Sequence, residues 1–326
     1  MTALRILLIG KRGSLVLWLE NLHRACIQSG YVTRIFAVNG DTLVSRLRIK
    51  WQGYTAMNAD WMLMRFERTL RKFHPDLIIA VGVFGVPLEY YQIVRKLPRR
   101  PLIAGLIGDR FPPDNQRANY CDRLYFTDSR FFSDAEAANF RVPGCYLPLA
   151  VDPTLFKPGH VLRHPELLFV ASRTEFRENV VRTLRRPARI IGTDWSSLTC
   201  SRLHQVQNHK ISRAALIRLY QSYQTVLNVR NEINVENGLN QRSFEPLACG
   251  AVVLNDDLAD LSRCFDPGRE ILVYRNSDEL NELINRLQQE PTFGVQVAEA
   301  GRQRVLAEHT YQHRIQFILN DLGLHS

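Results

Sequence analysis

The residues best suited to chemistry lie in one short stretch, Gly238 to Leu254. Its order is a small-residue loop, a short helix, a glycine stop at Gly250 and a buried strand. A helix that starts after a glycine turn presents unpaired backbone N–H groups and the positive end of its dipole, which favour an anion such as a diphosphate. Arg242 and Glu245 are three positions apart and share one helical face. We expect Arg242 to meet a phosphate and Glu245 to accept hydrogen bonds from a ribose diol.

A plainer interpretation of this stretch stays open. It could be an ordinary amphipathic helix with a capped start, whose arginine and glutamate form only a surface ion pair.

Alternating strands and helices are predicted on both sides of the stretch. Residues 4–10 read as a strand, 15–29 as a helix that Gly30 ends, and 31–38 as a second strand, which together make a βαβ unit. The glycines after the first strand, Gly10 and Gly13, fall short of a GxGxxG fingerprint, so they indicate a nucleotide cofactor only weakly. Further strands are expected over 77–81, 101–107, 121–128, 146–149, 167–171, 189–191, 225–229, 252–254 and 271–274, and helices over 59–73, 133–140, 178–184, 212–223, around 258, over 277–289 and from 295 to the end, interrupted near 309–311.

This alternation breaks once, in the proline-rich segment 151–159. A chain of 326 residues is long enough for two ordinary domains. We therefore predict an α/β fold of two doubly wound, Rossmann-like domains that face each other across a cleft. The first covers residues 1–152 and the second residues 160–305. Residues 306–326 are expected to form a helix that packs back on the first domain.

The composition, 45% hydrophobic and 23% charged, is that of a soluble globular protein. The apolar run at 4–9 is too short for a signal sequence or a membrane span. The six cysteines show neither CxxC spacing nor a His/Cys cluster, which predicts reduced thiols, a cytoplasmic location and no metal site.

The net charge of +10 falls mostly in the first half of the chain. A basic surface favours anionic partners, such as phosphorylated substrates, acidic lipid surfaces or nucleic acid, although a solvated basic face without a partner is an equal alternative. The charges cluster at Arg46, Arg48 and Lys50, at Arg65, Arg68, Arg71 and Lys72, and at Arg95, Lys96, Arg99 and Arg100.

Asp109 is the candidate catalytic group of the first half. It directly follows a buried strand, where α/β sheets place ligand-binding residues, and could act as catalytic base or position an acceptor. A turn aspartate that bonds its own backbone is the alternative. Gly10 and Gly13 are expected to let the backbone approach an acceptor or donor. Helix capping is the expected role of Asp128, and Ser212 and Ser277 are also expected to be N-caps.

The second half resembles the nucleotide-sugar domain of GT-B glycosyltransferases, specifically the group-1 branch that includes the spore maturation protein CgeB. The likeness covers about residues 165–320, and the first half only in outline. Its strongest part is Gly238-Leu239-Asn240 with Arg242, Phe244-Glu245 and Ala248-Cys249-Gly250. Other segments match in the same order along the chain as in the family. They are Phe169 to Arg173 with Arg177, Leu219-Tyr220, Val226 to Arg230, Glu279-Leu280, and His309 to Tyr311 with His313-Arg314.

The resemblance implies a role for each matching residue. Glu245 would hold the donor ribose, and Gly238, Leu239 and Asn240 would cradle the diphosphate or face the sugar. Arg173 and Arg177 would neutralise phosphate charge. Relatives often carry an acidic residue eight positions before the ribose glutamate, but here that position is Asn237, which weakens any two-carboxylate retaining site.

The function expected from these observations is metal-independent transfer of a sugar from a nucleoside-diphosphate sugar to an acceptor hydroxyl, without a further cofactor. Expected acceptors are a glycan, a lipid-linked molecule or a protein, with peripheral contact to an anionic membrane as a further expectation. Three alternatives stay open: a sugar-nucleotide epimerase of the same build, a Rossmann oxidoreductase, and a non-enzymatic anion- or nucleic-acid-binding protein. Nucleic acid is not an expected partner, because no motif supports it.

Overall fold

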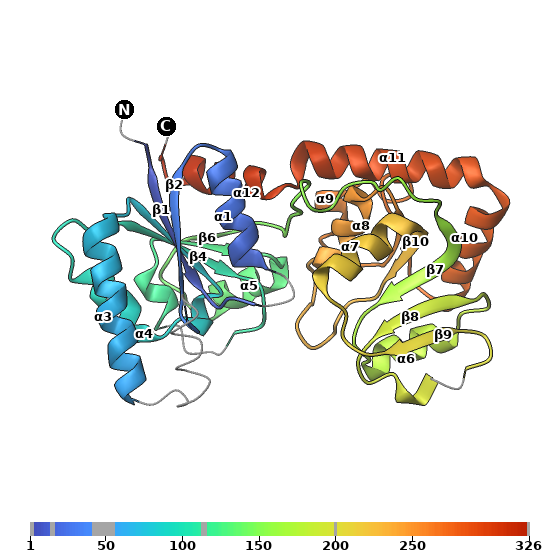
Figure 1. The fold of residues 1–326 in the computed structure, drawn as a ribbon, viewed down its shortest axis with the longest axis horizontal. Coiled ribbons are helices and arrows are strands. Elements are labelled where there is room, and N and C mark those ends of the chain that lie inside the picture. Colours follow the sequence, from blue (N-terminus) through green and yellow to red (C-terminus); the bar gives the residue numbers. More distant parts are fainter. Residues whose placement is uncertain (1–2, 14–16, 41–55, 112–115, 199–200, 325–326) are drawn as a thin grey trace. The chain divides into compact units, whose positions relative to one another are not determined.

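The computed structural model describes residues 3–13, 17–40, 56–111, 116–198 and 201–324. The chain divides into two compact units (Figure 1). The first contains residues 1–147 and 311–326, and the second contains residues 148–310. The start of the helix expected over 15–29 and the basic cluster expected at Arg46, Arg48 and Lys50 lie outside the described residues.

The first unit contains a six-stranded parallel sheet in the order β2-β1-β3-β4-β5-β6, an arrangement common to doubly wound folds. Its central strands are almost uninterrupted apolar runs, because helices cover both faces of a parallel sheet. The last strand, expected over 146–149, starts two residues earlier, at Gly144. The strands are β1 (Arg5–Gly10), β2 (Val32–Ala37), β3 (Leu77–Val81), β4 (Leu102–Ile107), β5 (Arg123–Phe126) and β6 (Gly144–Tyr146).

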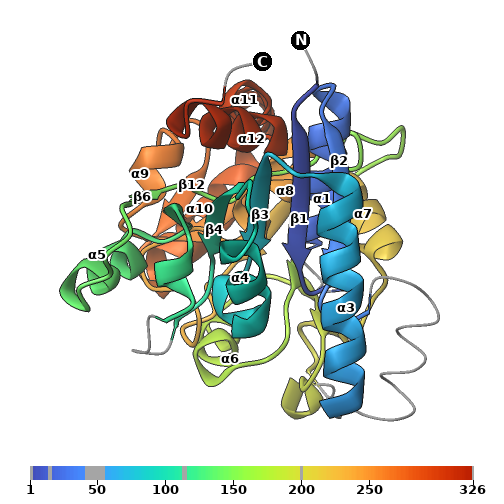
Figure 2. The same cartoon turned by 90° about the vertical axis from the view of Figure 1, so that its left-hand side faces the viewer.

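The helices of the first unit cover both faces of this sheet. On one face, α3 (Ala56–Phe73), α4 (Leu88–Arg95) and α5 (Ser129–Ala137) contribute to one hydrophobic core. On the other face, α1 (Trp18–Gln28) packs against α12 (Tyr311–Asp321), as Figures 1 and 2 show. The sequence missed α4, and it placed the start of α5 at Ser133, four residues too late.

Two sets of side-chain hydrogen bonds fix the start of α5 and the attachment of α12. Asp128 caps α5, as expected, since its Oδ1 accepts a hydrogen bond from the N–H of Arg130 at 2.9 Å. Asp321, at the end of α12, accepts hydrogen bonds from Arg123 Nε at 2.7 Å and from Tyr125 Oη at 2.8 Å. The last helix of the chain is thereby tied to β5 in the first unit.

The second unit contains a parallel sheet in the order β12-β11-β10-β7-β8-β9. Renumbered from β7, this order is 6-5-4-1-2-3, the arrangement of dinucleotide-binding sheets, and the strand order reverses between β7 and β10. The strands are β7 (His164–Val170), β8 (Ala188–Gly192), β9 (Gln205–Asn208), β10 (Tyr223–Asn228), β11 (Val252–Asp256) and β12 (Leu272–Tyr274). Strand β9 was missed because it is polar and only four residues long.

The helices of the second unit alternate with its strands. Ser212 caps α7 as expected, but the cap of α10 is Asn276 rather than Ser277: Asn276 Oδ1 accepts from the N–H groups of Asp278 and Glu279. The helices are α6 (Glu175–Arg182), α7 (Arg213–Ser222), α8 (Glu245–Ala248), α9 (Leu261–Cys264), α10 (Ser277–Gln289) and α11 (Pro291–Glu308). Within the described ranges, no helix combines the length and apolar character needed to cross a membrane.

Candidate functional site

The candidate site of the second unit lies where its strand order reverses. In open α/β sheets, ligands bind beyond the carboxyl ends of the strands at this point. The two strands concerned, β7 and β10, pair in parallel with Phe169 opposite Leu227, so the loops that follow them start side by side. The first of these loops carries Arg173, and the second leads to the stretch that begins at Gly238. Both segments singled out from the sequence therefore meet at one edge of the sheet.

The stretch after Gly238 folds into two short turns rather than one helix. A 3-10 turn over Gln241–Ser243 comes first, followed by α8. Asn240 caps the first turn, because its Oδ1 accepts a hydrogen bond from the N–H of Arg242 at 2.9 Å. The N–H groups of Ser243 and Phe244 also bond within the segment. For Arg242, Ser243 and Phe244, the expectation of unpaired amides is therefore wrong. Two buried side-chain donors of this segment have no described partner instead, Nδ2 of Asn240 and Nε2 of Gln241.

Arg242 is held in place by a buried polar network. Its Nε donates to Oδ1 of Asn228 at 3.0 Å. Asn228 is fully buried and donates through Nδ2 to Ser243 Oγ at 3.0 Å and to Asn255 Oδ1 at 2.6 Å. Ser243 Oγ donates to the same oxygen of Asn255 at 2.9 Å. The network thus ties one edge of the Arg242 guanidinium to β10 and β11, while no described residue accepts a hydrogen bond from its Nη groups.

A second arginine, Arg177, joins the two loops. Its side chain is 4% exposed, and its Nη1 donates to the Ser172 carbonyl at 3.0 Å. Its Nε donates to the carbonyls of Val229 and Arg230 at 3.3 and 3.2 Å. Burial, together with the positive charge of Arg242, lowers the pKa of Arg177 to about 9. Arg242 thus disfavours the charge of the buried Arg177, and an anion close to both guanidinium groups would stabilise that charge.

Glu245 is a buried carboxyl group without a hydrogen-bond donor among the described residues. It is 6% exposed. Burial raises its pKa to about 8, although Arg213 and Arg242 favour the charged form. Buried carboxyl groups are normally hydrogen-bonded, because an unsatisfied one is costly. A ligand with adjacent hydroxyl groups would supply the missing donors.

Arg173 takes part in an ion pair that the sequence did not reveal. Its Nε donates to Oε2 of Glu178. Glu178 is buried at the start of α6 and also accepts hydrogen bonds from Arg182 and, at 3.0 Å, from Ser197 Oγ. The hydrogen bond from Arg173 is the main reason why the pKa of Glu178 falls to about 2. The Arg173 side chain therefore has a fixed direction, and its Nη groups bond to no described residue.

The candidate residues of the first unit lie at the carboxyl edge of its own sheet. Asp109 is exposed in the bend after β4. Gly10 ends β1 and has a packing role, since a Cβ atom there would lie 2.7 Å from the carbonyl oxygen of Val81. Gly13 has a φ of +80°, which favours glycine, and a Cβ atom there would meet nothing within 4 Å.

Sequence reasoning missed the groups that support the site. The signal for Asn228 was available, because it is a polar residue inside an apolar strand. Arg213, at the start of α7, showed no such signal. Its guanidinium carbon lies 5.3 Å from the centre of the Phe156 ring. Its positive charge favours the charged form of Glu245 because the fold brings the two residues close together. Across the described residues, no group of three or more His, Cys, Asp and Glu side chains is placed to hold a metal ion.

Comparison with known proteins gives a consistent result. Residues 140–320 match the glycosyl transferase-like family. No curated protein matches the chain in sequence. Similar solved structures include a glycosyltransferase from Rickettsia africae, with a TM-score of 0.70, 11% identity and coverage of 98% of each chain. HepE from Anabaena in complex with UDP has a TM-score of 0.69 and 12% identity, over 98% of this chain and 100% of that chain.

Sucrose-phosphate synthase from Thermosynechococcus elongatus is similar to the same degree, with a TM-score of 0.68 and 12% identity, over 99% of this chain and 100% of that chain. At such identities the likeness establishes the fold. It confirms the predicted class, two doubly wound α/β units of the GT-B type.

Proposed function

The chain belongs to the glycosyl transferase-like family, and from this premise we propose that it transfers a sugar from UDP-sugar to an acceptor hydroxyl group. The proposed donor site lies at the carboxyl ends of β7 and β10 in the second unit. One observation carries the assignment: Glu245 is a buried carboxyl group without a described hydrogen-bond donor, near the partly buried guanidinium of Arg242. The choice of UDP rests on HepE, whose structures are complexes with UDP and with UDP-glucose.

In this proposal each group of the donor meets a matching group of the protein. The ribose hydroxyls donate to Glu245. The diphosphate lies against Arg177 and Arg242, and the backbone at Gly238 and Leu239 approaches it. The buried Nδ2 of Asn240 donates to a phosphate or sugar oxygen. Arg173 approaches the phosphate through its Nη groups. The Glu245 carboxyl group and the Nη groups of Arg173 and Arg242 thus gain the partners that no described residue supplies.

The proposed chemistry is mainly positioning and stabilisation of the departing UDP. Negative charge grows on the diphosphate as the anomeric bond breaks, and preorganised guanidinium groups stabilise that charge without a metal ion. We assign the acceptor, a glycan, a lipid-linked molecule or a protein, to the first unit. Asp109 would accept the proton of the acceptor hydroxyl there, and Gly10 and Gly13 would line the approach. Within the family, we place the chain in the CgeB-like branch on its 238–250 stretch.

A ligand screen tests the proposal directly. Ligands that bind the folded state raise the melting temperature, so UDP and UDP-sugars should stabilise the protein more than ADP or GDP. Glu245→Gln should weaken UDP binding measured by calorimetry by about tenfold or more, because a charge-assisted hydrogen bond is lost. The matched control is Glu282→Gln, which changes an exposed glutamate of α10.

Two results would oppose the assignment. One is the absence of stabilisation by any nucleoside diphosphate or nucleotide sugar. The other is equal UDP affinity in Glu245→Gln and the control. Release of UDP only in the presence of an acceptor would support transfer, whereas conversion of the sugar nucleotide without an acceptor would favour an epimerase.

A further inference from the structure

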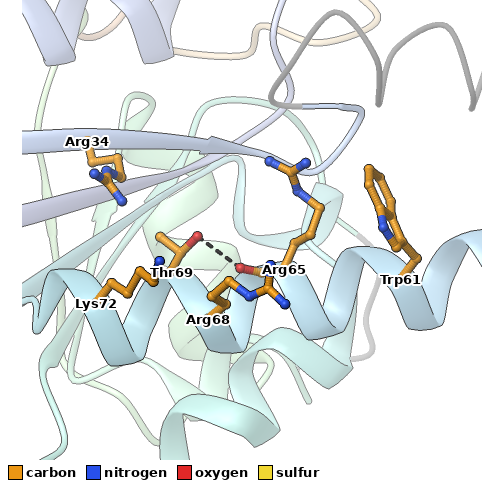
Figure 3. A pocket seen from close by; sticks show the side chains of 6 residues that line it. All are labelled: Arg34, Trp61, Arg65, Arg68, Thr69 and Lys72. Carbon is orange, nitrogen blue, oxygen red and sulfur yellow. Dashed lines mark hydrogen bonds between the residues drawn. The ribbon is translucent and has the colours of Figure 1, made fainter.

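The first unit has a basic hollow that the proposed function does not use. It measures about 370 Å³, and its lining comes from strand β2 and helix α3 (Figure 3). The lining residues are Arg34, Trp61, Arg65, Arg68, Thr69 and Lys72. In α3, Trp61, Arg65, Arg68 and Lys72 are three or four positions apart and Thr69 directly follows Arg68, so these five residues form one stripe along the helix. The apolar residues of α3, such as Phe66 and Leu70, point into the core instead.

Three of the cations around this hollow have no ionic partner among the residues that the structure describes. Arg34, Arg68 and Lys72 are exposed and form no ion pair with any described acidic residue. The one glutamate in the middle of α3, Glu67, lies 3.8 Å from Arg71, which is not part of the lining. Like charges gathered at one place raise the free energy of the unliganded surface. An anion in the hollow would remove this repulsion.

Aromatic rings hold two of the guanidinium groups in place. The Arg65 guanidinium carbon lies 4.9 Å from the centre of the Trp61 ring, and that of Arg34 lies 5.3 Å from the centre of the Phe73 ring. Thr69 Oγ1 donates to the Arg65 carbonyl at 2.9 Å, so this hydroxyl can still accept a hydrogen bond. Planar guanidinium groups with restricted motion match the oxygen atoms of a phosphate.

We propose that the hollow between β2 and α3 binds a phosphate-bearing ligand with at least two negative charges. Its volume is within the range of sites for small ligands. A free polyphosphate and the phosphate of a lipid headgroup share this chemistry, and the experiment below separates them.

The hollow is also apart from the edge that carries Asp109. Helix α3 runs from the end of β2 back toward the start of β3, so Arg68, Thr69 and Lys72 lie in its last turns, near the amino ends of the strands. Asp109 follows the carboxyl end of β4. The ligand of the hollow is thus a second anion, whose binding does not depend on the proposed transferase activity.

The test uses the whole protein and two probes, inorganic pyrophosphate in calorimetry and vesicles in co-sedimentation. One set of vesicles is phosphatidylcholine alone, and the other also contains phosphatidylglycerol. The site variant is Arg68→Glu with Lys72→Glu, both exposed residues. The control is Arg141→Glu with Lys157→Glu, which makes the same change of charge at exposed positions outside the hollow that, like Arg68 and Lys72, form no ion pair with a described acidic residue. Circular dichroism checks that both variants fold.

We expect the wild type and the control to bind pyrophosphate or anionic vesicles. The affinity of the site variant should be lower by about tenfold or more, because two charge-assisted contacts are lost. Loss confined to pyrophosphate identifies a soluble ligand, and loss confined to anionic vesicles identifies a lipid headgroup. Equal losses in both variants, or no binding of either probe by the wild type, would overturn the proposal. Pyrophosphate that binds only in the second unit would be unaffected by the site variant and would also overturn it.

Discussion

Replacing Glu245 by glutamine should remove a large part of the pH dependence of stability between pH 6 and pH 8. Burial raises the pKa of Glu245 from 4.5 to about 8 in the folded protein. Between these values the folded state keeps a proton that the unfolded state releases. This contribution is complete below the unfolded pKa and is lost as the pH rises through the folded pKa.

The size of the effect follows from the shift. One pKa unit corresponds to about 1.4 kcal/mol, so the whole shift is worth about 5 kcal/mol and the part lost between pH 6 and pH 8 is about 2 kcal/mol. Glutamine has nearly the same shape and no proton to release. The difference in unfolding free energy between the wild type and Glu245→Gln should therefore change by about 2 kcal/mol over this interval.

Urea unfolding at pH 6, 7 and 8, followed by tryptophan fluorescence, measures this change. Trp195, fully buried in the second unit, reports on the unit that contains Glu245. Other titrating groups cancel in the comparison of wild type and variant, and the exposed-site variant Glu282→Gln should behave as the wild type. An identical pH dependence in the wild type and Glu245→Gln would refute the reasoning.

Saturating UDP extends the test to the ribose. Hydrogen bonds from ribose hydroxyls favour the carboxylate, so UDP should lower the pKa of Glu245 and flatten the pH dependence of the wild type. If UDP binds and the pH dependence stays unchanged, the ribose role of Glu245 is refuted, although its burial is not.

Three further predictions concern the supports of the two units. Asn228→Ala should lower the unfolding free energy by about 2–3 kcal/mol, since it leaves buried partners unsatisfied, and should also weaken UDP binding by releasing Arg242; urea unfolding and calorimetry check the two effects, and unchanged UDP affinity would contradict the second. Gly10→Ala should destabilise the first unit by about 1–3 kcal/mol, because the new Cβ atom meets the Val81 carbonyl; an unchanged melting temperature would contradict this. Asp321→Ala should cost about 1 kcal/mol and make the amides of α12 exchange faster in hydrogen exchange; equal protection in the wild type and the variant would count against this tie.

Much of the fold was predictable from local pattern. Strands buried on both faces leave uninterrupted apolar runs, which is why residues 77–81 and 225–229 were recognisable. Short polar side chains before a helix satisfy its first amides, which identified the caps Asp128 and Ser212. Elements that lack these patterns were missed, as the polar strand β9 shows.

The candidate site was predictable in composition but not in geometry. The stretch from Gly238 was found because a glycine turn, an arginine and a glutamate stand close together in the sequence. Three of its amides turned out to be bonded within the segment, one to the Asn240 side chain and two to backbone carbonyls. The ion pair of Arg173 with Glu178 was not predictable either, since several carboxylates of the sequence could have formed it.

The sequence by itself determined that the chain alternates buried strands with amphipathic helices in two halves, because solvent exposure and backbone capping act over a few neighbouring residues. Only the tertiary structure decided the strand order that brings the loops after β7 and β10 together, and with it the burial that raises the pKa of Glu245. It also decided that Arg34, from a strand, completes the basic stripe of α3. These properties depend on distances between residues far apart in the chain, and such distances are fixed only when the sheets and helices pack.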